Sequence, residues 1–511
     1  MNLARAIAMA GCVLAISAAP ASSQTVMERV DLSAVQKIRD EGLNRSKLDD
    51  LASYLTDVIG ARLTNSPGSR KANEWAAETF RSWGLANVKV EPWDTTFGRG
   101  WEIVSYSGRI LDPWTKPLDA YPQAWSGSTK GTITCPVVVF EVRDSADLAK
   151  YTGKLKGACV LRGAPAVIGP EFEPRDRRIS LDDLLEPPAP PAQGGRQGGP
   201  AGGQSNFARQ AALNAAAARL LRSEQPAAVL QSSGWTYGII RNGGHFDGRS
   251  ARDSVYNPVP NLLVAHEQYG TLYRVAQRGL PARVELNLQT RFLDDNRTPA
   301  NVVAEIPGTD KADEVVMLGA HFDSWHSGTG ATDNGAGSVV MMEAIRILKT
   351  LGLPMRRTVR IGLWTGEEQG LIGSSRYLRI HQAELPKISA YVNLDNGTGK
   401  IRGIWSQSNS AVVPIFEQIL SPFRDLGVLA VRDGNTGGTD HQSFDRVGVP
   451  GFNFIQDPIE YSIRTHHSNV DTYERLVIDD LKQAATVVAW TVYHIANRDE
   501  MMPRKAPRPV P

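Results

Sequence analysis

Residues 315–323, with the sequence VVMLGAHFD, decide the fold of this chain. An unbroken apolar run that ends in polar residues is typical of a strand buried on both faces of a sheet. Three later apolar runs share this character, at 358–364, 390–394 and 451–455. Amphipathic stretches typical of helices accompany them, at 338–351, 374–382, 412–426 and 478–496. Strands that alternate with helices predict an α/β fold with a central mixed, mostly parallel sheet that is covered on both faces.

The part of the chain before this sheet divides into two regions. Residues 35–84 have a helical pattern in two pieces, and residues 88–90 have the pattern of a strand. From about 103 to 289 the pattern changes to short β-like runs, which indicates an inserted β-rich domain. Within it, residues 186–205 are rich in proline and glycine and predict a disordered loop. We expect a main domain formed by 25–102 together with 290–500. Residues 103–289 would form an insertion in it, and residues 501–511 a tail.

Composition and the N-terminus limit the classes of protein to consider. The 511 residues carry 56 Lys and Arg against 54 Asp and Glu, and this net charge of +2 argues against a nucleic-acid partner. Residues 1–24 have one charged side chain, an apolar run and then small residues, which is typical of a secretory signal peptide. The apolar run, Ala6 to Ala18, is too short for a stable membrane span. We therefore expect an extracytoplasmic protein, periplasmic or secreted.

Two cysteines remain once the predicted signal peptide, with Cys12, is removed. Cys135 and Cys159 each lie in an apolar, strand-like run. In an oxidising compartment they are consistent either with a disulfide or with two buried thiols. No histidine lies near them in the sequence, so we do not predict a zinc site there.

Polar residues follow the predicted strands at one edge of the sheet. His321 and Asp323 come directly after the first strand, and Glu367 with Glu368 after the second. Ligands of parallel α/β sheets bind at this edge, beyond the carboxyl ends of the strands. Three further candidates lie after a strand or at the start of the first helix, namely Asp333, Asp395 and His467. Carboxylates gathered at one place repel one another unless a divalent cation relieves the repulsion.

Each of these residues has an ordinary explanation when it is taken alone. Asp333 is placed to cap a helix, the two glutamates resemble a solvated acidic turn, and His467 resembles a surface residue. Their combination favours a metal site, and imidazoles mixed with carboxylates suit zinc better than magnesium or calcium. His266 and Glu267 begin an H-E-x-x-H pattern, but Gly270 stands where its second histidine is needed. The sequence also contains no G-x-S-x-G elbow and no phosphate-binding loop.

Four motifs give the chain a resemblance to a known family. They are HFDSW at 321–325, ATDNGAG at 331–337, LWTGEEQG at 363–370 and HHSNVDT at 466–472. Together they resemble the motifs of the co-catalytic zinc aminopeptidase and carboxypeptidase family. The resemblance implies a phosphorylase/hydrolase-like α/β zinc exopeptidase domain with an inserted protease-associated β domain.

The resemblance also implies roles for individual residues. Two zinc ions would be bound, one by His321, Asp333 and Asp395 and the other by Asp333, Glu368 and His467. Asp323 would orient His321, and Glu367 would be the general base for the metal-activated water. Candidates for binding the substrate are Asn435, Tyr461, Arg464 and His466. The family likeness further suggests a homodimer.

The function expected from these roles is hydrolysis of dipeptides or short peptides by a metallo-exopeptidase. A broad aminopeptidase is the main alternative, because both activities use the same metal centre. An enzyme similar to glutaminyl cyclases and a non-catalytic binding ectodomain are further alternatives. Asn334 follows the shared aspartate where relatives often have Asp, and His441 is unusual after the Gly-Thr-Asp segment at 438–440.

Overall fold

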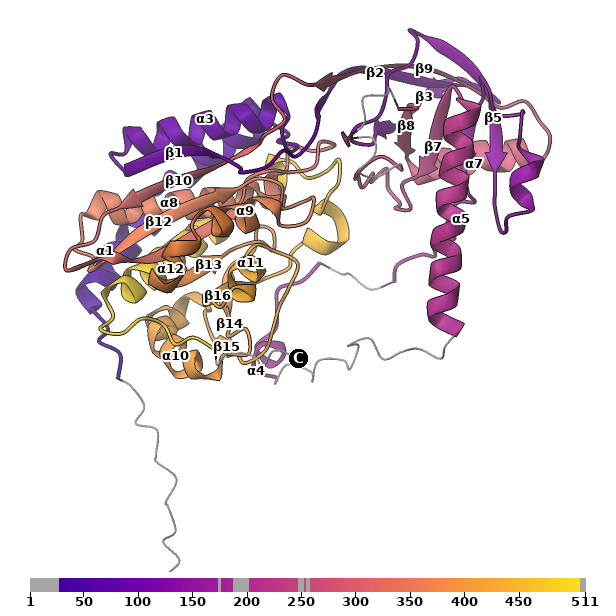
Figure 1. Cartoon of the computed structure of the whole chain (residues 1–511). Helices are drawn as coiled ribbons and strands as arrows, with labels where there is room; N and C mark the ends of the chain where they lie inside the picture. The colour runs from indigo at the N-terminus through magenta and orange to yellow at the C-terminus, as the bar shows by residue number, and fades with distance from the viewer. Residues whose placement is uncertain (1–26, 173–175, 187–201, 247–251, 254–257, 506–511) are drawn as a thin grey trace, which may run out of the picture.

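The computed structural model describes residues 27–172, 176–186, 202–246, 252–253 and 258–505. The predicted signal peptide at 1–24 and most of the predicted loop at 186–205 lie outside these residues. The described part forms two bodies that lie side by side, each built on its own sheet (Figure 1). No helix within the described ranges is long and apolar enough to cross a membrane.

The first body contains the predicted α/β sheet. Its eight strands have the order β1-β10-β12-β11-β13-β16-β14-β15. The bounds are β1 Ala86–Pro92, β10 Ala300–Ile306, β11 Lys311–His321, β12 Arg357–Trp364, β13 Ile388–Asn393, β14 Ile401–Trp405, β15 Ala430–Arg432 and β16 Gly451–Gln456. The four central strands, β12, β11, β13 and β16, are parallel, whereas β1, β10 and β14 pair antiparallel with their inner neighbours. The predicted mixed sheet is therefore confirmed.

Helices cover both faces of this sheet because the central strands are apolar on both sides. In β11, Val316 and Leu318 pack into one core and Val315 and Met317 into another. The first core also includes residues of α1 Leu32–Asn44, α2 Leu48–Ser53, α3 Pro67–Ser82, α8 Ala336–Leu351, α10 Val413–Leu420 and α12 Ile478–Asn497. The second includes residues of α9 Ile372–Ile380 and α11 His441–Arg446. Burial on both faces fixes the position of the strand ends that carry the candidate site.

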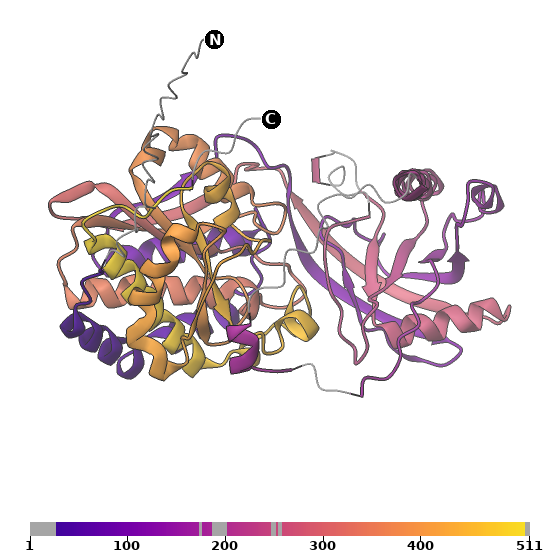
Figure 2. The same cartoon turned by 90° about the horizontal axis from the view of Figure 1, so that it is seen from below.

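The second body is a sheet with the order β3-β2-β9-β5-β6-β7-β8-β4. Its strands are β2 Gly100–Asp112, β3 Lys116–Pro117, β4 Ala120–Pro122, β5 Ile133–Phe140, β6 Cys159–Arg162, β7 Ala228–Ser232, β8 Asn261–Val264 and β9 Arg283–Leu293. All of them come from one stretch of chain between β1 and β10, and we call this body the insert. The long strands β2 and β9 pair with each other, and β2 begins and β9 ends on the side of the first body (Figure 2).

The range 103–289, where a β-rich domain is expected, also contains helices. They include α4 Leu181–Leu185, α5 Gly202–Glu224 and α7 His266–Gln277. Residues 202–205, expected to end a disordered loop, belong to α5 instead. The alanine-rich run that follows them has a high helix propensity, and it outweighs the glycines at the start. Buried Leu221 of α5 and Tyr269 of α7 then pack against the strands.

The two cysteines of the insert form a disulfide. Cys135 in β5 and Cys159 in β6 have Cα atoms 5.5 Å apart, and both are fully buried. Of the two states consistent with the sequence, the structure has the disulfide, which joins neighbouring parallel strands.

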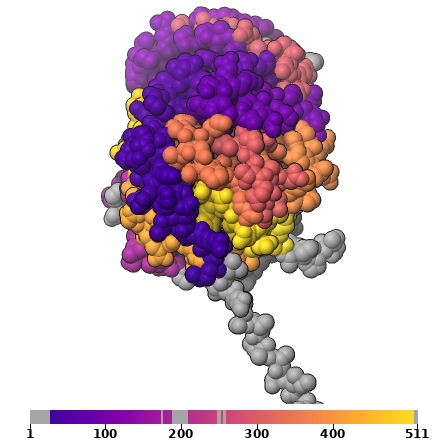
Figure 3. Space-filling model, turned by 90° about the vertical axis from the view of Figure 1, so that its left-hand side faces the viewer, coloured from indigo at the N-terminus to yellow at the C-terminus, as the bar shows by residue number. Residues whose placement is uncertain are grey.

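The first and last described residues also pack on the first body. Glu28, near the first described residue, pairs with His494 and Arg498 of the C-terminal segment, and the N-terminal residues lie beside the C-terminal ones on the surface (Figure 3). The described residues of the predicted tail pack as well, since Met502 is buried and its amide donates to Ser389 Oγ.

Candidate metal centre

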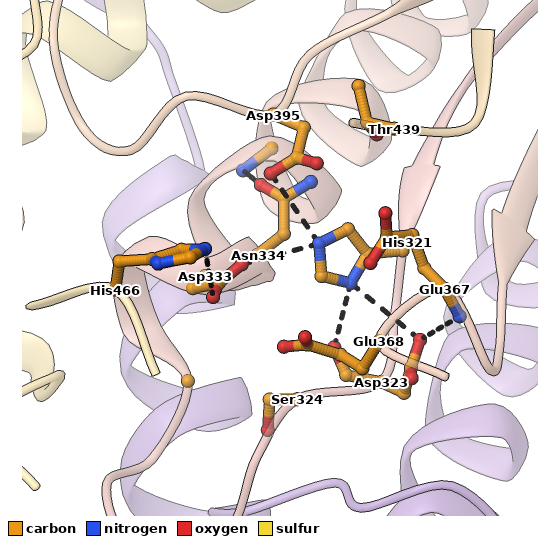
Figure 4. Close-up of polar contacts among 12 residues, drawn as sticks. His321, Asp323, Ser324, Asp333, Asn334, Glu367, Glu368, Asp395, Thr439 and His466 are labelled. Carbon is orange, nitrogen blue, oxygen red and sulfur yellow. Dashed lines mark hydrogen bonds and ion pairs between the residues drawn. The ribbon is translucent and has the colours of Figure 1, made fainter. Parts of the chain in front are cut away.

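The predicted residues meet at the carboxyl edge of the first sheet. His321 is the last residue of β11, and Asp395 follows β13 after one intervening residue. Asp333 lies in the turn Ala331–Gly335 that precedes α8, and its own backbone is not helical, with φ −126° and ψ 89°. The Nε2 atom of His321 is 3.4 Å from Asp333 Oδ1 and 3.5 Å from Asp395 Oδ1. These three buried side chains form the first half of the site (Figure 4).

The second half forms around the other oxygen of the same aspartate. His467 Nε2 is 2.8 Å from Glu368 Oε2 and 3.2 Å from Asp333 Oδ2. His466 Nε2 is 3.8 Å from the same Oδ2 atom. Asp333 therefore presents Oδ1 to the first half and Oδ2 to the second, which is the arrangement expected of a shared ligand.

Asp323 supports both His321 and the chain after β12. The Nδ1 atom of His321 is 3.0 Å from the Asp323 carbonyl oxygen, which suits an Nδ1–H donor and leaves Nε2 free to bind a metal. One carboxylate oxygen of Asp323 accepts from the Glu367 amide at 3.2 Å, and the other accepts from Thr64 Oγ1 at 2.9 Å. Asp323 thus links the orientation of His321 to the position of Glu367.

The charge of the cluster suits a bound cation. Burial raises the pKa of both Glu367 and Glu368 well above the usual range, and neighbouring carboxylates add to the effect. Burial alone would lower the pKa of His321, but Asp395 and the other carboxylates raise it well above its usual value. Asp333 Oδ2 and Glu368 Oε1 are buried and accept no hydrogen bond from the described residues. Crowded carboxylates with unused oxygens are a donor set for a divalent metal, so the residues fit such an ion.

Two of the four candidate substrate-binding residues lie at the site, and two do not. A cavity of about 430 Å³ opens over the cluster, and Tyr461 and His466 line it. The Tyr461 hydroxyl donates to Asp333 Oδ1 at 3.0 Å and lies 3.4 Å from Asp395 Oδ1. Arg464 and Asn435 are absent from the cavity lining, because Arg464 pairs with Asp176 and Glu460 and Asn435 is exposed and donates to Ser408.

Three residues near the centre were not singled out from the sequence. Arg62 is fully buried, and burial lowers its pKa to about 10, so it remains charged at neutral pH. Asp471 lies within the quoted HHSNVDT motif, but its position there does not reveal that it binds main-chain amides. Arg241 comes from the insert and stacks on Trp235, with its Cζ 3.8 Å from the ring centroid. None of the three has a sequence signal of its own, because each has a contact near the centre with a residue distant in the chain, as Arg241 has with Ser462.

The chain is similar to known peptidases. Residues 301–492 match peptidase family M28. Carboxypeptidase Q of Mus musculus is 29% identical over 451 residues, which are 88% of this chain and 86% of that protein. Probable leucine aminopeptidase 2 of Arthroderma benhamiae is 32% identical over 236 residues, 40% of this chain and 46% of that protein.

Solved structures share the fold. A peptidase M28 precursor from Shewanella amazonensis superposes with a TM-score of 0.67 at 23% identity, over 93% of this chain and 99% of that chain. BSAP, a zinc aminopeptidase from Bacillus subtilis, gives a TM-score of 0.57 at 21% identity, over 88% and 95%.

The fold, the cluster and these matches support a metallo-exopeptidase, and residues 301–492 match peptidase family M28. The family resemblance predicted from the four motifs is thereby confirmed. Over most of its length, the chain is similar to carboxypeptidase Q.

Proposed function

We propose that this protein is an exopeptidase that hydrolyses dipeptides or short peptides with two zinc ions. The observation that supports this is that one carboxylate oxygen of Asp333 faces His321 and the other faces His467. His321, Asp333 and Asp395 would hold one ion, and Asp333, Glu368 and His467 the other. When bound, such ions polarise a scissile carbonyl and stabilise the negative charge that develops on its oxygen.

Glu367 is the proposed general base. Its amide is fixed by Asp323, while its side chain lines the cavity beside the ligand Glu368. The raised pKa, caused first by burial, suits a carboxylate that takes a proton from the attacking water and then gives it to the leaving amine. Tyr461 points its hydroxyl into the same place and is the proposed donor to the substrate carbonyl oxygen.

Arg241 favours a dipeptidase over a broad aminopeptidase. Its main chain bridges to Ser468, next to His467, and its guanidinium donates to the Ser462 carbonyl, so the insert brings a cation near His467, although Arg241 is not part of the cavity lining. The pKa of His466 and of His467 is lowered by burial, and the charge of Arg241 lowers it further. A guanidinium held this close to His466 and His467 would attract the free carboxylate of a short substrate.

The remaining parts of the proposal concern the whole chain. The insert would act as a protease-associated-like domain that restricts the site to short substrates. Export through residues 1–24 agrees with the disulfide, which persists in oxidising compartments. A homodimer is proposed from the family likeness.

Three substrates test the proposed reaction, namely a free dipeptide, its C-terminal amide and its N-acetylated form. We expect cleavage of the free dipeptide alone, about two zinc ions per chain, and a loss of at least ~100-fold in Glu367→Gln. The exposed Glu417→Gln is the matched control and should retain activity. Equal cleavage of the amide would identify an aminopeptidase instead. No cleavage of any of them despite bound zinc would reject the exopeptidase proposal.

Arg241→Met tests the carboxylate site separately. We expect KM for the free dipeptide to rise by about 10-fold, since one charge-assisted hydrogen bond is worth about 1.5–3 kcal/mol. The matched control is Arg109→Met in the insert, where the arginine is exposed and pairs with Glu285. An unchanged KM in Arg241→Met would remove the support for a dipeptidase.

A further inference from the structure

We propose that Arg62 and Asp471 form a hydrogen-bond clamp on residues 329–333, and that this clamp makes Asp333 a shared metal ligand. The proposal rests on the proposed two-metal function. Neither residue is placed among the metal ligands, and both act on main-chain atoms. They are therefore positioning residues.

Arg62 holds the carbonyl side of the segment. Its side chain is fully buried. Nη1 donates to the Thr329 carbonyl at 2.7 Å and Nη2 to the Gly330 carbonyl at 2.8 Å. Nε donates to the Phe322 carbonyl at 2.8 Å, and Nη1 also donates to the Gly60 carbonyl at 2.9 Å. One guanidinium thus ties the residue that follows His321 to the segment that leads to Asp333.

The segment is shaped to admit the guanidinium. Gly330 has a φ of 63°, in the left-handed region that favours glycine. A Cβ atom at Gly330 would lie 3.0 Å from Arg62 Nη2 and 2.3 Å from Ser324 Cβ, and one at Gly335 would lie 3.5 Å from Nη2. The first two distances are too short for a side chain to be accommodated without movement, so this cradle depends on glycine at 330.

Asp471 holds the amide side of the same segment. Its Oδ1 accepts from the Thr332 amide at 2.6 Å and its Oδ2 from the Asp333 amide at 3.1 Å. Its own carbonyl accepts from the Thr329 amide at 2.9 Å. The Asp471 side chain is buried, so water does not compete for these bonds.

The two residues together restrain Asp333 from both directions. Carbonyls of 329 and 330 are bound by Arg62, and amides of 332 and 333 are bound by Asp471. A shift of the Asp333 main chain would break one set of bonds. Because the two oxygens of Asp333 face different halves of the site, a small rotation would misplace both. The clamp should therefore affect the binding of both ions.

The test compares two buried arginines by substitution. Arg357 is also fully buried and donates to the carbonyls of Ile495 and Arg498, at the opposite end of the sheet from the site. We expect Arg62→Lys and Arg357→Lys both to lower the melting temperature of the metal-free protein. Only Arg62→Lys should weaken zinc binding, by about 10- to 100-fold in chelator competition, as for other residues that support metal ligands.

Asp471→Asn provides a second variant that keeps the side-chain shape. It should also weaken zinc binding by about 10-fold or more, and it carries the test if Arg62→Lys does not fold. Unchanged zinc affinity in the variants that fold would overturn the clamp. Failure of the proposed function gives a different result, namely a wild-type protein that binds two zinc ions and hydrolyses no peptide. The zinc affinities of the variants would still decide the clamp in that case.

Discussion

The two halves of the candidate metal centre are supported in different ways. His321 ends β11 and Asp395 follows β13, both central strands of the first sheet, and the two residues are 1% and 9% exposed. His467 lies on a loop, and its side chain is 30% exposed. The insert supports this loop, because the Asn242 amide donates to the His467 carbonyl at 2.7 Å. The first half is therefore supported by the first body, whereas the second also depends on contact between the two bodies.

Substitution of the shared ligand Asp333 should affect both halves of the metal centre. Asp333→Asn should lower kcat/KM by more than about 100-fold and release metal from both halves, a larger effect than that of any residue that only supports a ligand. Metal content and kinetics on the free dipeptide measure it. Asp479→Asn is the control, because that side chain is 90% exposed. Full retention of two ions in Asp333→Asn would contradict the shared role.

Loosening the contact with the insert should affect the second half selectively. Asn469 joins the His467 loop to the insert, since its Oδ1 accepts from the Ile240 amide at 2.8 Å and its Nδ2 donates to the Gly238 carbonyl at 3.2 Å. We expect Asn469→Ala to lower the affinity for one of the two zinc ions by about 10-fold and to leave the affinity for the other unchanged. Zinc titration in the presence of a competing chelator should then show two separate affinities.

A buried asparagine elsewhere provides the control for this variant. Asn409 is 5% exposed, and its Nδ2 donates to the Pro503 carbonyl. Asn409→Ala should lower stability without changing either zinc affinity. An equal loss of affinity for both zinc ions in Asn469→Ala would show that the two halves do not differ in their dependence on the insert.

The smallest effect on the site is expected far from it, at the N-terminal contact. Burial alone would raise the pKa of Glu28, but hydrogen bonds from His494 and Arg498 lower it to about 2. Because the pKa is depressed in the folded state, ionised Glu28 stabilises the protein at pH values above its unfolded pKa. This contribution is lost as pH falls toward about 2.

Glu28→Gln should therefore lower the free energy of unfolding by about 1–2 kcal/mol at pH 7, and the difference from wild type should shrink near pH 3. Urea unfolding at both pH values measures it. Zinc content and activity should stay unchanged, which separates global stability from support of the site. A drop in zinc affinity would mean that the first half also depends on this end of the chain.

Much of the first body could be predicted because its pattern is local. The run 315–320 predicted a strand, and β11 extends it back to Lys311, where charged residues conceal the start. The helix predicted at 478–496 matches α12 almost residue for residue. Strand ends also predicted which polar residues meet, since topology brings the ends of parallel strands to one edge.

The rest depends on partners that are distant in the sequence. Arg62 binds carbonyls about 260 residues away, so no spacing or motif in the sequence predicts its role. The family resemblance makes Arg464 a candidate for binding a substrate, but Asp176, distant in the sequence, pairs with it. Helix α5 was missed because its glycine-rich start resembles a loop. Each difference comes from a tertiary contact or a propensity that overrides the local composition.

The described segment 176–186 has a consequence for how separable the two bodies are. Although it belongs to the insert by sequence, it lies on the first body, where Arg178 pairs with Asp457 and Leu184 packs against Ala430 and Ile455. The polypeptide therefore contacts the first body at 176–186, in the middle of the insert, whereas α5 packs within the insert. A unit attached in this way cannot be excised as a cassette by joining two points, nor can it swing about a single hinge. Exchange of this insert between related enzymes would have to carry the matching surface of the first body with it.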